Sequence, residues 1–314
     1  FKGKVKFVYH NGNIVKAINK IKPDIIYPTW DKIYNKCKIP QIAYLYDCQH
    51  RYFPEYFKKH SIESRDKYFQ SVVDNYKAII VGSLDAKNDL IKFYGAKPEQ
   101  VFSIFGSPLL DKNYLDEIKT DVIEKYQLPK KYFMVCSQFW KHKSHITVIE
   151  AVKQLKENGI DVCVVCTGNT EDYRNPEYFG ELQQKIKEWD LENNIKILGL
   201  IDRREQIELI KKSTAVIQPS LYEGGAGAGG SAEAISFGKP VIMSDIPINK
   251  EYSKFNNIFY FETKNADSLA KNMKIVLNTV FKKYTNDELK QMSDKNRQKE
   301  IEKIYAPIQA LLKN

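Results

Sequence analysis

Short apolar runs alternate with helical sequence patterns along most of this chain. The runs are rich in valine and isoleucine and end at glycine, proline or polar residues, as in Ala78–Val81 and Ala215–Gln218. Such runs are typical of strands buried on both faces of a sheet, and strands separated by helices form parallel sheets. The alternation therefore predicts an α/β protein in which helices cover parallel sheets.

The predicted elements fall into two groups. In the first group we expect helices at 61–73 and 85–94 and strands at 24–27, 41–46, 78–81 and 101–104. Ser83 and Gly95 are the expected start and stop signals of the second helix. In the second group we expect helices at 145–157, 178–189, 203–212 and 231–237 and strands at 132–136, 162–166, 195–198, 215–218 and 240–244.

The length of 314 residues is typical of two domains. We predict a first lobe at 1–108, a linker with a short helix at 109–127, a second lobe at 128–285 and a C-terminal helix at 286–314. Apolar residues repeat at helical spacing near the end of the chain. They predict one apolar face on the last helix, made by Ile301, Ile304, Tyr305, Ile308, Leu311 and Leu312.

The formal net charge of +10 favours an anionic partner: nucleic acid, an anionic membrane face or a small phosphorylated ligand. The basic residues come in scattered pairs, such as Arg203-Arg204 and Lys211-Lys212, rather than in one long run. The sequence contains no zinc finger, RNA-recognition signature or basic heptad region. We therefore expect no nucleic acid partner, and scattered pairs are also typical of solvated helix faces.

The cysteines and histidines give no sign of a metal or redox centre. Five widely spaced cysteines indicate reduced thiols and a cytoplasmic setting. Cys163 and Cys166 have the spacing of a redox motif, but they lie in an apolar run that predicts a buried strand. His142 and His145 have no matching partner pair, so we expect them to cap or pack the following helix and expect no metal.

The ends of the chain and its hydropathy bear on localisation. The first residues lack the apolar core of a signal peptide. No stretch approaches the ~18 apolar residues of a membrane helix. We expect a cytoplasmic protein that is soluble or at most peripheral at a membrane face.

The segment from Gln218 to Asp245 is the most informative part of the sequence. A predicted strand leads into a glycine-rich turn, and a predicted helix follows from about Ser231. Small residues let backbone N–H groups approach a ligand, and a helix N-terminus favours a bound phosphate. Glu223 precedes the turn and Glu233 lies in the first helical turn, where a carboxylate can accept hydrogen bonds from ribose or sugar hydroxyls. The alternative is a flexible loop in which Glu233 only stabilises the helix terminus.

This segment resembles the donor-site signature of retaining glycosyltransferase family four, with its Pro-Ser-x-x-Glu-Gly opening at Pro219 and its Gly-x-Pro-Val close at Gly238. Further segments resemble the same family in the same order. They are 47–55 (its acceptor-side loop), 81–95 (the end of its N-terminal lobe), 137–145 (the first turn of its C-terminal lobe) and 202–210 (the helix before the donor strand). The likeness covers residues 22–275. It implies the GT-B fold: two Rossmann-like lobes with parallel sheets, and a C-terminal helix that packs back toward the N-terminal lobe.

The resemblance also implies roles for residues of the C-terminal lobe. Lys143 would pair with the donor diphosphate, and Glu233 would hold the ribose hydroxyls. Glu223 would contact the transferred sugar or its developing charge. Gly224 and Gly225 would present backbone N–H groups to the sugar or phosphate.

Asp47 and His50 would face the sugar and the acceptor from the N-terminal lobe. The implied catalytic residues are therefore Glu223, Asp47 and His50, and Ser220 and Gln138 complete the implied donor-binding set. The alternative for His50 is a loop histidine held by hydrogen bonds.

The implied reaction moves a hexose-type sugar from a UDP-sugar or GDP-sugar to a hydroxyl acceptor, which would be a glycan, a lipid-linked sugar or a protein. Retention and independence of metal come from the resemblance, and the sequence lacks the Asp-x-Asp pair of metal-dependent single-domain enzymes. Lys143 and the helix N-terminus would stabilise the departing nucleoside diphosphate. No cofactor is implied. The basic charge leaves peripheral binding to an anionic membrane open.

The chain departs from the family pattern in several places. Glu223 and Glu233 are ten residues apart, which is wider than the family's spacing. Gln138 replaces an arginine, Tyr46 replaces a histidine, and Ala226 stands where an aromatic residue is usual. These changes keep two alternatives to a transferase open: a non-catalytic module that binds nucleotide sugars, and a GT-B epimerase of nucleotide sugars.

The N-terminal lobe is expected to be incomplete. A doubly wound lobe begins with a strand, a glycine-rich turn and a helix, and we find no such pattern before Lys22. Either the chain is a fragment or this lobe is reduced.

Overall fold

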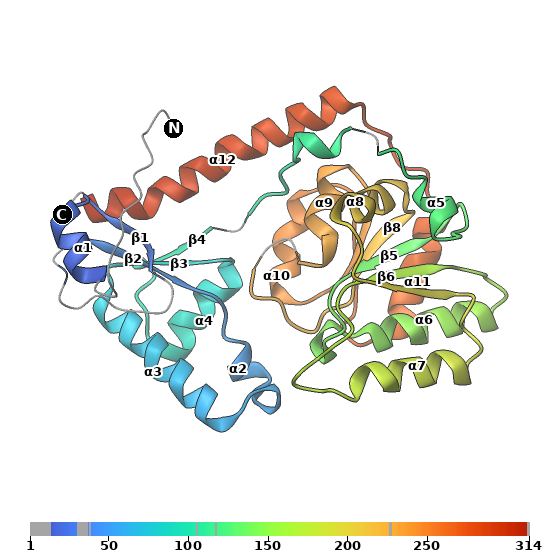
Figure 1. The fold of residues 1–314 in the computed structure, drawn as a ribbon, viewed down its shortest axis with the longest axis horizontal. Coiled ribbons are helices and arrows are strands. Elements are labelled where there is room, and N and C mark those ends of the chain that lie inside the picture. The colour runs from blue at the N-terminus through green and yellow to red at the C-terminus, as the bar shows by residue number, and fades with distance from the viewer. Residues whose placement is uncertain are drawn as a thin grey trace.

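The computed structural model describes residues 14–29, 37, 39–104, 106–116, 118–225 and 228–312. Within them the chain forms two separate parallel sheets, each covered by helices (Figure 1). The expected two-lobed α/β architecture is therefore confirmed.

Among the described residues, the N-terminal lobe contains four strands in the order β1-β2-β3-β4, all parallel. The strands are β1 (Ile26–Thr29), β2 (Gln41–Leu45), β3 (Ala78–Val81) and β4 (Val101–Ser103). The helices are α1 (Ile14–Ile21), α2 (Gln49–Tyr52), α3 (Lys59–Asn75) and α4 (Leu84–Tyr94), with a 3-10 turn η1 (Pro54–Tyr56).

In the part of the C-terminal lobe that the structure describes, six parallel strands run in the order β10-β9-β8-β5-β6-β7. They are β5 (Phe133–Cys136), β6 (Val164–Thr167), β7 (Ile195–Gly199), β8 (Ala215–Gln218), β9 (Val241–Ser244) and β10 (Ile258–Phe261). The helices are α5 (Val122–Lys125), α6 (His145–Glu157), α7 (Tyr178–Glu188), α8 (Arg203–Lys212), α9 (Ser231–Ser236), α10 (Pro247–Lys250), α11 (Ala266–Leu277) and α12 (Asn286–Leu312). Four 3-10 turns complete the set: η2 (Lys112–Tyr114), η3 (Lys141–Lys143), η4 (Ala228–Gly230) and η5 (Glu251–Lys254).

The larger sheet is buried on both faces, as its valine- and isoleucine-rich strands predict. One face packs against α6, α7 and α11, and the other packs against α8 and α9. Strands β8 and β9 are buried along their whole length. Because both faces are sealed, ligands have access mainly where the strands end.

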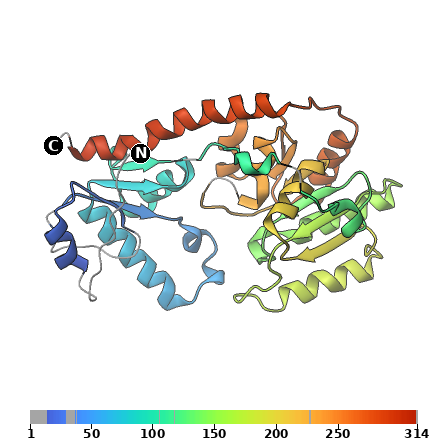
Figure 2. The ribbon, with the colours of Figure 1, turned by 45° about the horizontal axis from the view of Figure 1, so that its top comes forward.

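Two segments cross between the lobes, and they are tied to each other. The linker leaves β4 for the second lobe, while α12 runs back over both lobes (Figures 1 and 2). The Ser107 hydroxyl donates to Glu300 of α12 at 2.6 Å, and the Leu110 N–H donates to the Ser293 hydroxyl at 2.9 Å. Ile308 of α12 packs on the core of the N-terminal sheet. The expected packing of the C-terminal helix toward the N-terminal lobe is confirmed.

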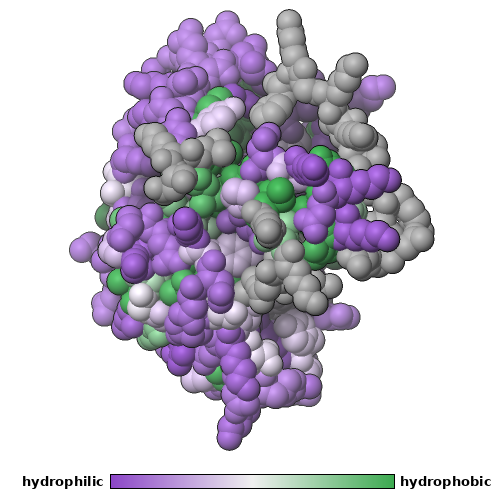
Figure 3. All heavy atoms as spheres, turned by 90° about the vertical axis from the view of Figure 1, so that its left-hand side faces the viewer, coloured by the Kyte–Doolittle hydropathy of each residue, from purple (hydrophilic) through white to green (hydrophobic). Residues whose placement is uncertain are grey.

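The apolar face predicted for α12 is only partly buried. Ile308 and Leu311 pack on the N-terminal sheet, whereas Ile301, Ile304 and Tyr305 are 41 to 46% exposed. From that end of the molecule, the surface is mostly hydrophilic with small apolar areas (Figure 3).

Most predicted elements are present, with shifted ends. Ser83 caps α4 by accepting from the Ala86 N–H, and Gly95 ends that helix in the left-handed region, as predicted. The predictions missed strand β10 and the helices α1, α2, α10 and α11. Helix α1 lies before Lys22, where no helix was expected, and residues 1–13 lie outside the described part. The domain boundaries stay predictions.

The central strand β8 offers a test of this packing. Ile217 is fully buried against the core under α6 and α11, so Ile217→Ala should lower the free energy of unfolding by about 2–5 kcal/mol. Ile275→Ala in α11 should change it by less than ~0.5 kcal/mol, because Ile275 is 42% exposed. Urea unfolding measures both, and equal losses would contradict the layer arrangement.

Candidate active site between the two lobes

The glycine-rich loop leaves the carboxyl end of β8 and enters α9. Its last residue before the helix, Gly230, has a φ of 73°, a left-handed conformation that favours glycine. A Cβ at Gly230 would also lie 2.9 Å from the Cβ of Cys136. Helix α9 is only six residues long, so its dipole adds little positive potential at this end of the loop. Ala226, where the family pattern has an aromatic residue, lies outside the described residues.

Lys143 and Glu223 form an ion pair in this region. Lys143 lies in η3 after β5, and Glu223 follows β8, so two neighbouring strands bring them together. The Lys143 Nζ lies 2.6 Å from the Glu223 Oε1, and the side chains are only 14% and 9% exposed. A buried pair of this kind is costly to break by removing one partner, because the other charge is left without compensation.

Three polar side-chain atoms around the loop are buried without a hydrogen-bond partner in the described structure. They are the Gln218 Oε1, the Ser231 Oγ and the Glu233 Oε2. Native proteins rarely leave such atoms unsatisfied, because each loses its hydration without compensation. All three atoms lie at the two ends of one loop, in Gln218 before it and in helix α9 after it.

Arg203 is a site residue that the sequence analysis did not single out. It begins α8, and its guanidinium contacts the other carboxylate oxygen of Glu233, the Oε1. Burial lowers the pKa of Arg203, but the Glu233 charge and the hydrogen bonds to Tyr114 and Glu233 outweigh burial, so the pKa is raised. The basic pair Arg203-Arg204 was the only signal in the sequence.

The loop also contacts the N-terminal lobe at Gly224. A Cβ built there would lie 2.5 Å from the Cβ of Asp47, so only glycine fits. The Gly224 carbonyl accepts from the Ser83 hydroxyl, the N-cap of α4, at 3.3 Å. A Cβ at Gly82 would lie 3.1 Å from the Gly225 Cα. The structure thus places Asp47 directly against the loop at Gly224.

Glu251 is a second residue that sequence reasoning missed. Its two carboxylate oxygens accept from the first amides of α4, those of Leu84 and Asp85, at 3.1 Å each. The carboxylate belongs to the C-terminal lobe and the helix to the N-terminal lobe. Since a helix start has unpaired N–H groups, this contact holds the lobes together. Tyr222 adds to it, because its hydroxyl accepts from the Cys48 N–H at 3.1 Å.

His50 lies inside the N-terminal lobe and is 1% exposed. Its Nε2 lies 3.0 Å from both Asp66 and the Tyr94 hydroxyl, and its Nδ1 accepts from Arg65 at 3.2 Å. Burial is the main cause that lowers the pKa of His50. The geometry matches the alternative of a hydrogen-bonded histidine, and the structure does not bring its ring to the loop.

The remaining predicted donor residues are spread along the strand ends. Ser220 is buried, and its carbonyl accepts from the Ser244 hydroxyl at 2.6 Å. Gln138 is exposed after β5, and its side chain forms no hydrogen bond with the described residues. A Cβ at Gly225 would meet no described atom within 4 Å, so this side of the loop is open.

The histidines beside Lys143 are neutral. Burial, with a contribution from the Lys143 charge, lowers the pKa of both His142 and His145 to about 3. His145 begins α6 and stacks on Phe139 with ring centroids 4.1 Å apart, as expected for a residue that packs this helix. Lys143 rather than either histidine therefore supplies positive charge near Glu223.

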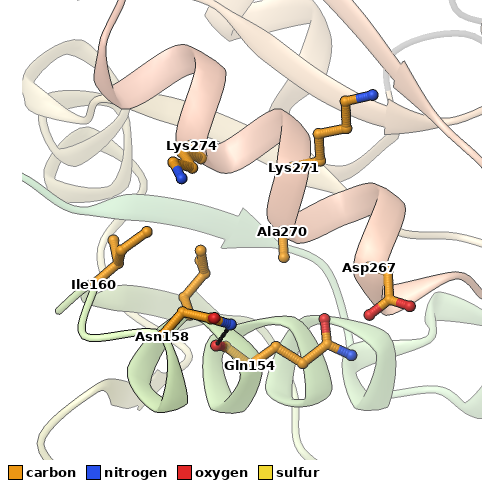
Figure 4. A pocket seen from close by; sticks show the side chains of 8 residues that line it. Gln154, Asn158, Ile160, Asp267, Ala270, Lys271 and Lys274 are labelled. Carbon is orange, nitrogen blue, oxygen red and sulfur yellow. Dashed lines mark hydrogen bonds between the residues drawn. The ribbon is translucent and has the colours of Figure 1, made fainter.

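A cavity of about 380 Å³ lies between α6 and α11, lined by Gln154, Asn158, Asp267 and Lys271 among others, and contains none of the predicted site residues (Figure 4). Among the described residues no group of His, Cys, Asp or Glu is arranged to hold a metal ion. No helix in the described ranges has the length and apolar character needed to span a bilayer.

Comparison with known proteins places this arrangement in a class. A glycosyltransferase from Rickettsia africae matches with a TM-score of 0.67 and 20% identity, over 98% of this chain and 83% of that chain. Anabaena HepE, solved with UDP, matches with a TM-score of 0.67 and 17% identity, over 96% of this chain and 80% of that chain. The two lobes therefore have the GT-B fold of glycosyltransferases.

The sequence comparisons identify the family. The model of the family described as glycosyl transferases group 1 matches residues 116–299, more than half of the chain, so the protein belongs to this family. The O-antigen chain mannosyltransferase RfbU of Salmonella typhimurium is 26% identical over 229 residues. That match covers 70% of this chain but only 59% of the length of RfbU.

The two loop glycines form a matched pair for a test. Gly224→Ala should lower the free energy of unfolding by about 1–3 kcal/mol, because its Cβ would press on Asp47 and separate the lobes. Gly225→Ala should cost less than ~1 kcal/mol, because its Cβ meets nothing. Urea unfolding measures both changes. A Gly224→Ala protein as stable as the Gly225→Ala protein would contradict the close contact.

The buried histidines predict how stability depends on pH. An unfolded chain protonates histidine near pH ~6.5, whereas folded His145 stays neutral until about pH 3. The unfolded state therefore binds more protons in this window, and the free energy of unfolding falls as pH falls from ~6.5 toward 3. His145→Phe, which keeps the ring stack on Phe139, should show a smaller fall in denaturant titrations. An unchanged slope would contradict the buried neutral state.

Proposed function

We propose that this protein transfers a hexose-type sugar from a nucleoside diphosphate sugar to a hydroxyl acceptor. The membership in glycosyl transferases group 1 gives the reaction class. The proposal that the donor is a nucleoside diphosphate sugar rests on three polar atoms at the loop that have no partner among the described residues. They are the Gln218 Oε1, the Ser231 Oγ and the Glu233 Oε2. A nucleoside diphosphate sugar has ribose hydroxyls and phosphate oxygens that match these groups.

In the proposed complex, the diphosphate of the donor replaces Glu223 as the partner of Lys143. Its Nζ is bound to Glu223 in this structure, at 2.6 Å. A diphosphate beside the loop would take over the lysine charge, and the loop amides around Gly224 and Gly225 would donate to phosphate or sugar oxygens. Glu223 would then be free to accept a hydroxyl of the transferred sugar. Glu233 would accept the ribose hydroxyls through its Oε2 while Arg203 holds its Oε1.

After this exchange, Lys143 would promote the reaction electrostatically, by stabilising the charge on the departing phosphate. Negative charge grows on the phosphate as the sugar departs, and a fixed cation nearby is worth more in the transition state than in the ground state. Lys143 is positioned in advance by a buried partner, so little reorganisation is needed when the charge develops. We further propose that Asp47 faces the transferred sugar from the N-terminal lobe, and that the reaction proceeds with retention and without metal, as in family four.

The named relatives support the donor type. HepE has been solved with UDP and with UDP-glucose, and RfbU is a mannosyltransferase. We therefore propose a UDP-sugar or a GDP-sugar as donor, and a glycan, a lipid-linked sugar or a protein as acceptor. A cytoplasmic location, with peripheral contact to an anionic membrane, is part of the same proposal.

A thermal-shift panel of UDP, GDP, UDP-glucose and GDP-mannose tests donor binding. A ligand present at 100 times its dissociation constant should add ~2.7 kcal/mol of stability. Glu233→Ala should weaken a nucleoside and its diphosphate together, because both contain the ribose. No stabilisation by any member of the panel would contradict the proposal.

Lys143 should act on the diphosphate alone. Lys143→Met should weaken the nucleoside diphosphate about tenfold or more and leave the free nucleoside unchanged, because a charge-assisted hydrogen bond is worth ~1.5–3 kcal/mol. Since Lys143→Met leaves Glu223 buried without its partner, the double variant K143M/E223Q is measured beside it. Lys141→Ala is the matched control, because Lys141 is an exposed lysine of the same turn η3. Equal effects at Lys141 and Lys143 would contradict the role.

Product analysis separates transfer from the alternatives. A transferase should hydrolyse its donor slowly or transfer the sugar, Glu223→Ala should abolish both, and NMR of the product should show the anomeric configuration of the donor. Binding without turnover would instead indicate a nucleotide-sugar-binding module. A changed nucleotide sugar formed without acceptor would indicate an epimerase.

A further inference from the structure

A cavity of about 200 Å³ lies between the lobes next to Glu223. From the N-terminal lobe it is lined by Tyr52, Phe53 and Asp85. From the C-terminal lobe it is lined by Leu221, Tyr222, Glu223, Ile246, Pro247 and Ile248. Glu223 thus contacts Lys143 through one carboxylate oxygen while the residue also borders this cavity.

The walls of the cavity are largely apolar and are fixed in place. The Tyr222 ring lies 5.6 Å from the Tyr52 ring and 6.2 Å from the Phe53 ring, between centroids. The hydroxyl of Tyr52 donates to Asp89 at 2.5 Å, and that of Tyr222 accepts from Cys48. Both phenols therefore turn their polar ends to protein partners, and both residues line the cavity. Sugar rings pack their C–H faces on such aromatic surfaces.

Two carboxylates that line the cavity can still accept hydrogen bonds. The Oε2 of Glu223 and the carboxylate of Asp85 accept no hydrogen bond from the described residues. Desolvation by burial raises the pKa of Asp85. The lining contains no lysine or arginine. Carboxylates accept hydroxyls in pairs. The Glu223 charge is compensated by Lys143, so Asp85 is the carboxylate that repels an anion in this cavity.

We propose that this cavity is an acceptor subsite for an uncharged sugar ring, whose hydroxyls bond to Asp85 and Glu223 and whose apolar face packs on Phe53 and Tyr222. The proposal rests on the proposed function, because Glu223 is the residue shared with the donor. It names the acceptor at this position as a neutral glycoside rather than a sugar phosphate or another anionic group.

Ligand-observed NMR with methyl α-mannoside, methyl α-glucoside and mannose 6-phosphate tests the subsite directly on the whole chain. At least one neutral glycoside should bind about tenfold or more tightly than the phosphate. Asp85→Asn should reduce the difference in affinity between the glycoside and the phosphate, because the amide keeps the shape of the side chain but removes its negative charge. Tighter binding of the phosphate, or no binding of either glycoside, would overturn the proposal.

Kinetics with the neutral glycoside as acceptor gives the second readout. Phe53→Ala and Asp85→Asn should each raise the KM for the glycoside about tenfold, with a smaller effect on the KM for the donor. Lys271→Ala, in the cavity between α6 and α11, is the control that should leave both constants as in the wild type. A change confined to the donor KM would assign the cavity to the donor sugar and overturn the proposal. If no nucleotide sugar binds at all, the proposed function fails, while glycoside binding by NMR still decides the cavity.

Discussion

The buried ion pair between Lys143 and Glu223 is the interaction on which the site depends. Its two residues come from loops after neighbouring strands, so the pair fixes the position of one loop against the other. Both charges are largely removed from water, and neither can be left alone cheaply. An anionic ligand that displaced Glu223 would compensate the positive charge of Lys143 and would leave the Glu223 carboxylate free for another partner. In the proposed function, the pair is the resting state, and a bound diphosphate replaces Glu223 as the partner of Lys143.

The lobes meet around the same pair. Gly224 packs on Asp47, the N-cap Ser83 donates to the Gly224 carbonyl, and Glu251 caps the start of α4 from the opposite lobe. On the far side, the linker and α12 are bonded to each other where they cross. The position of the glycine-rich loop therefore depends on the contact between the lobes. Separating the lobes would expose the first amides of α4 and remove the contacts of Gly224 with Asp47 and Ser83.

Much of this fold could be predicted from the sequence, because its signals are local. Runs such as Ala78–Val81 give buried strands, and capping residues such as Ser83 mark helix ends. The loop with Glu223 was also found locally. Arg203 and Glu251 were not, since their partners lie 30 and 167 residues away in the chain. A sequence carries no direct signal for such tertiary contacts. For the same reason the interior position of His50 became visible only in the structure.

A structure with bound UDP or GDP, whichever nucleotide binds more tightly, tests whether a diphosphate displaces Glu223 from Lys143. We expect a diphosphate oxygen within ~3 Å of the Lys143 Nζ, with the Lys143–Glu223 pair separated and the ribose hydroxyls on Glu233. A diphosphate bound elsewhere, with Lys143 still paired to Glu223, would contradict this expectation.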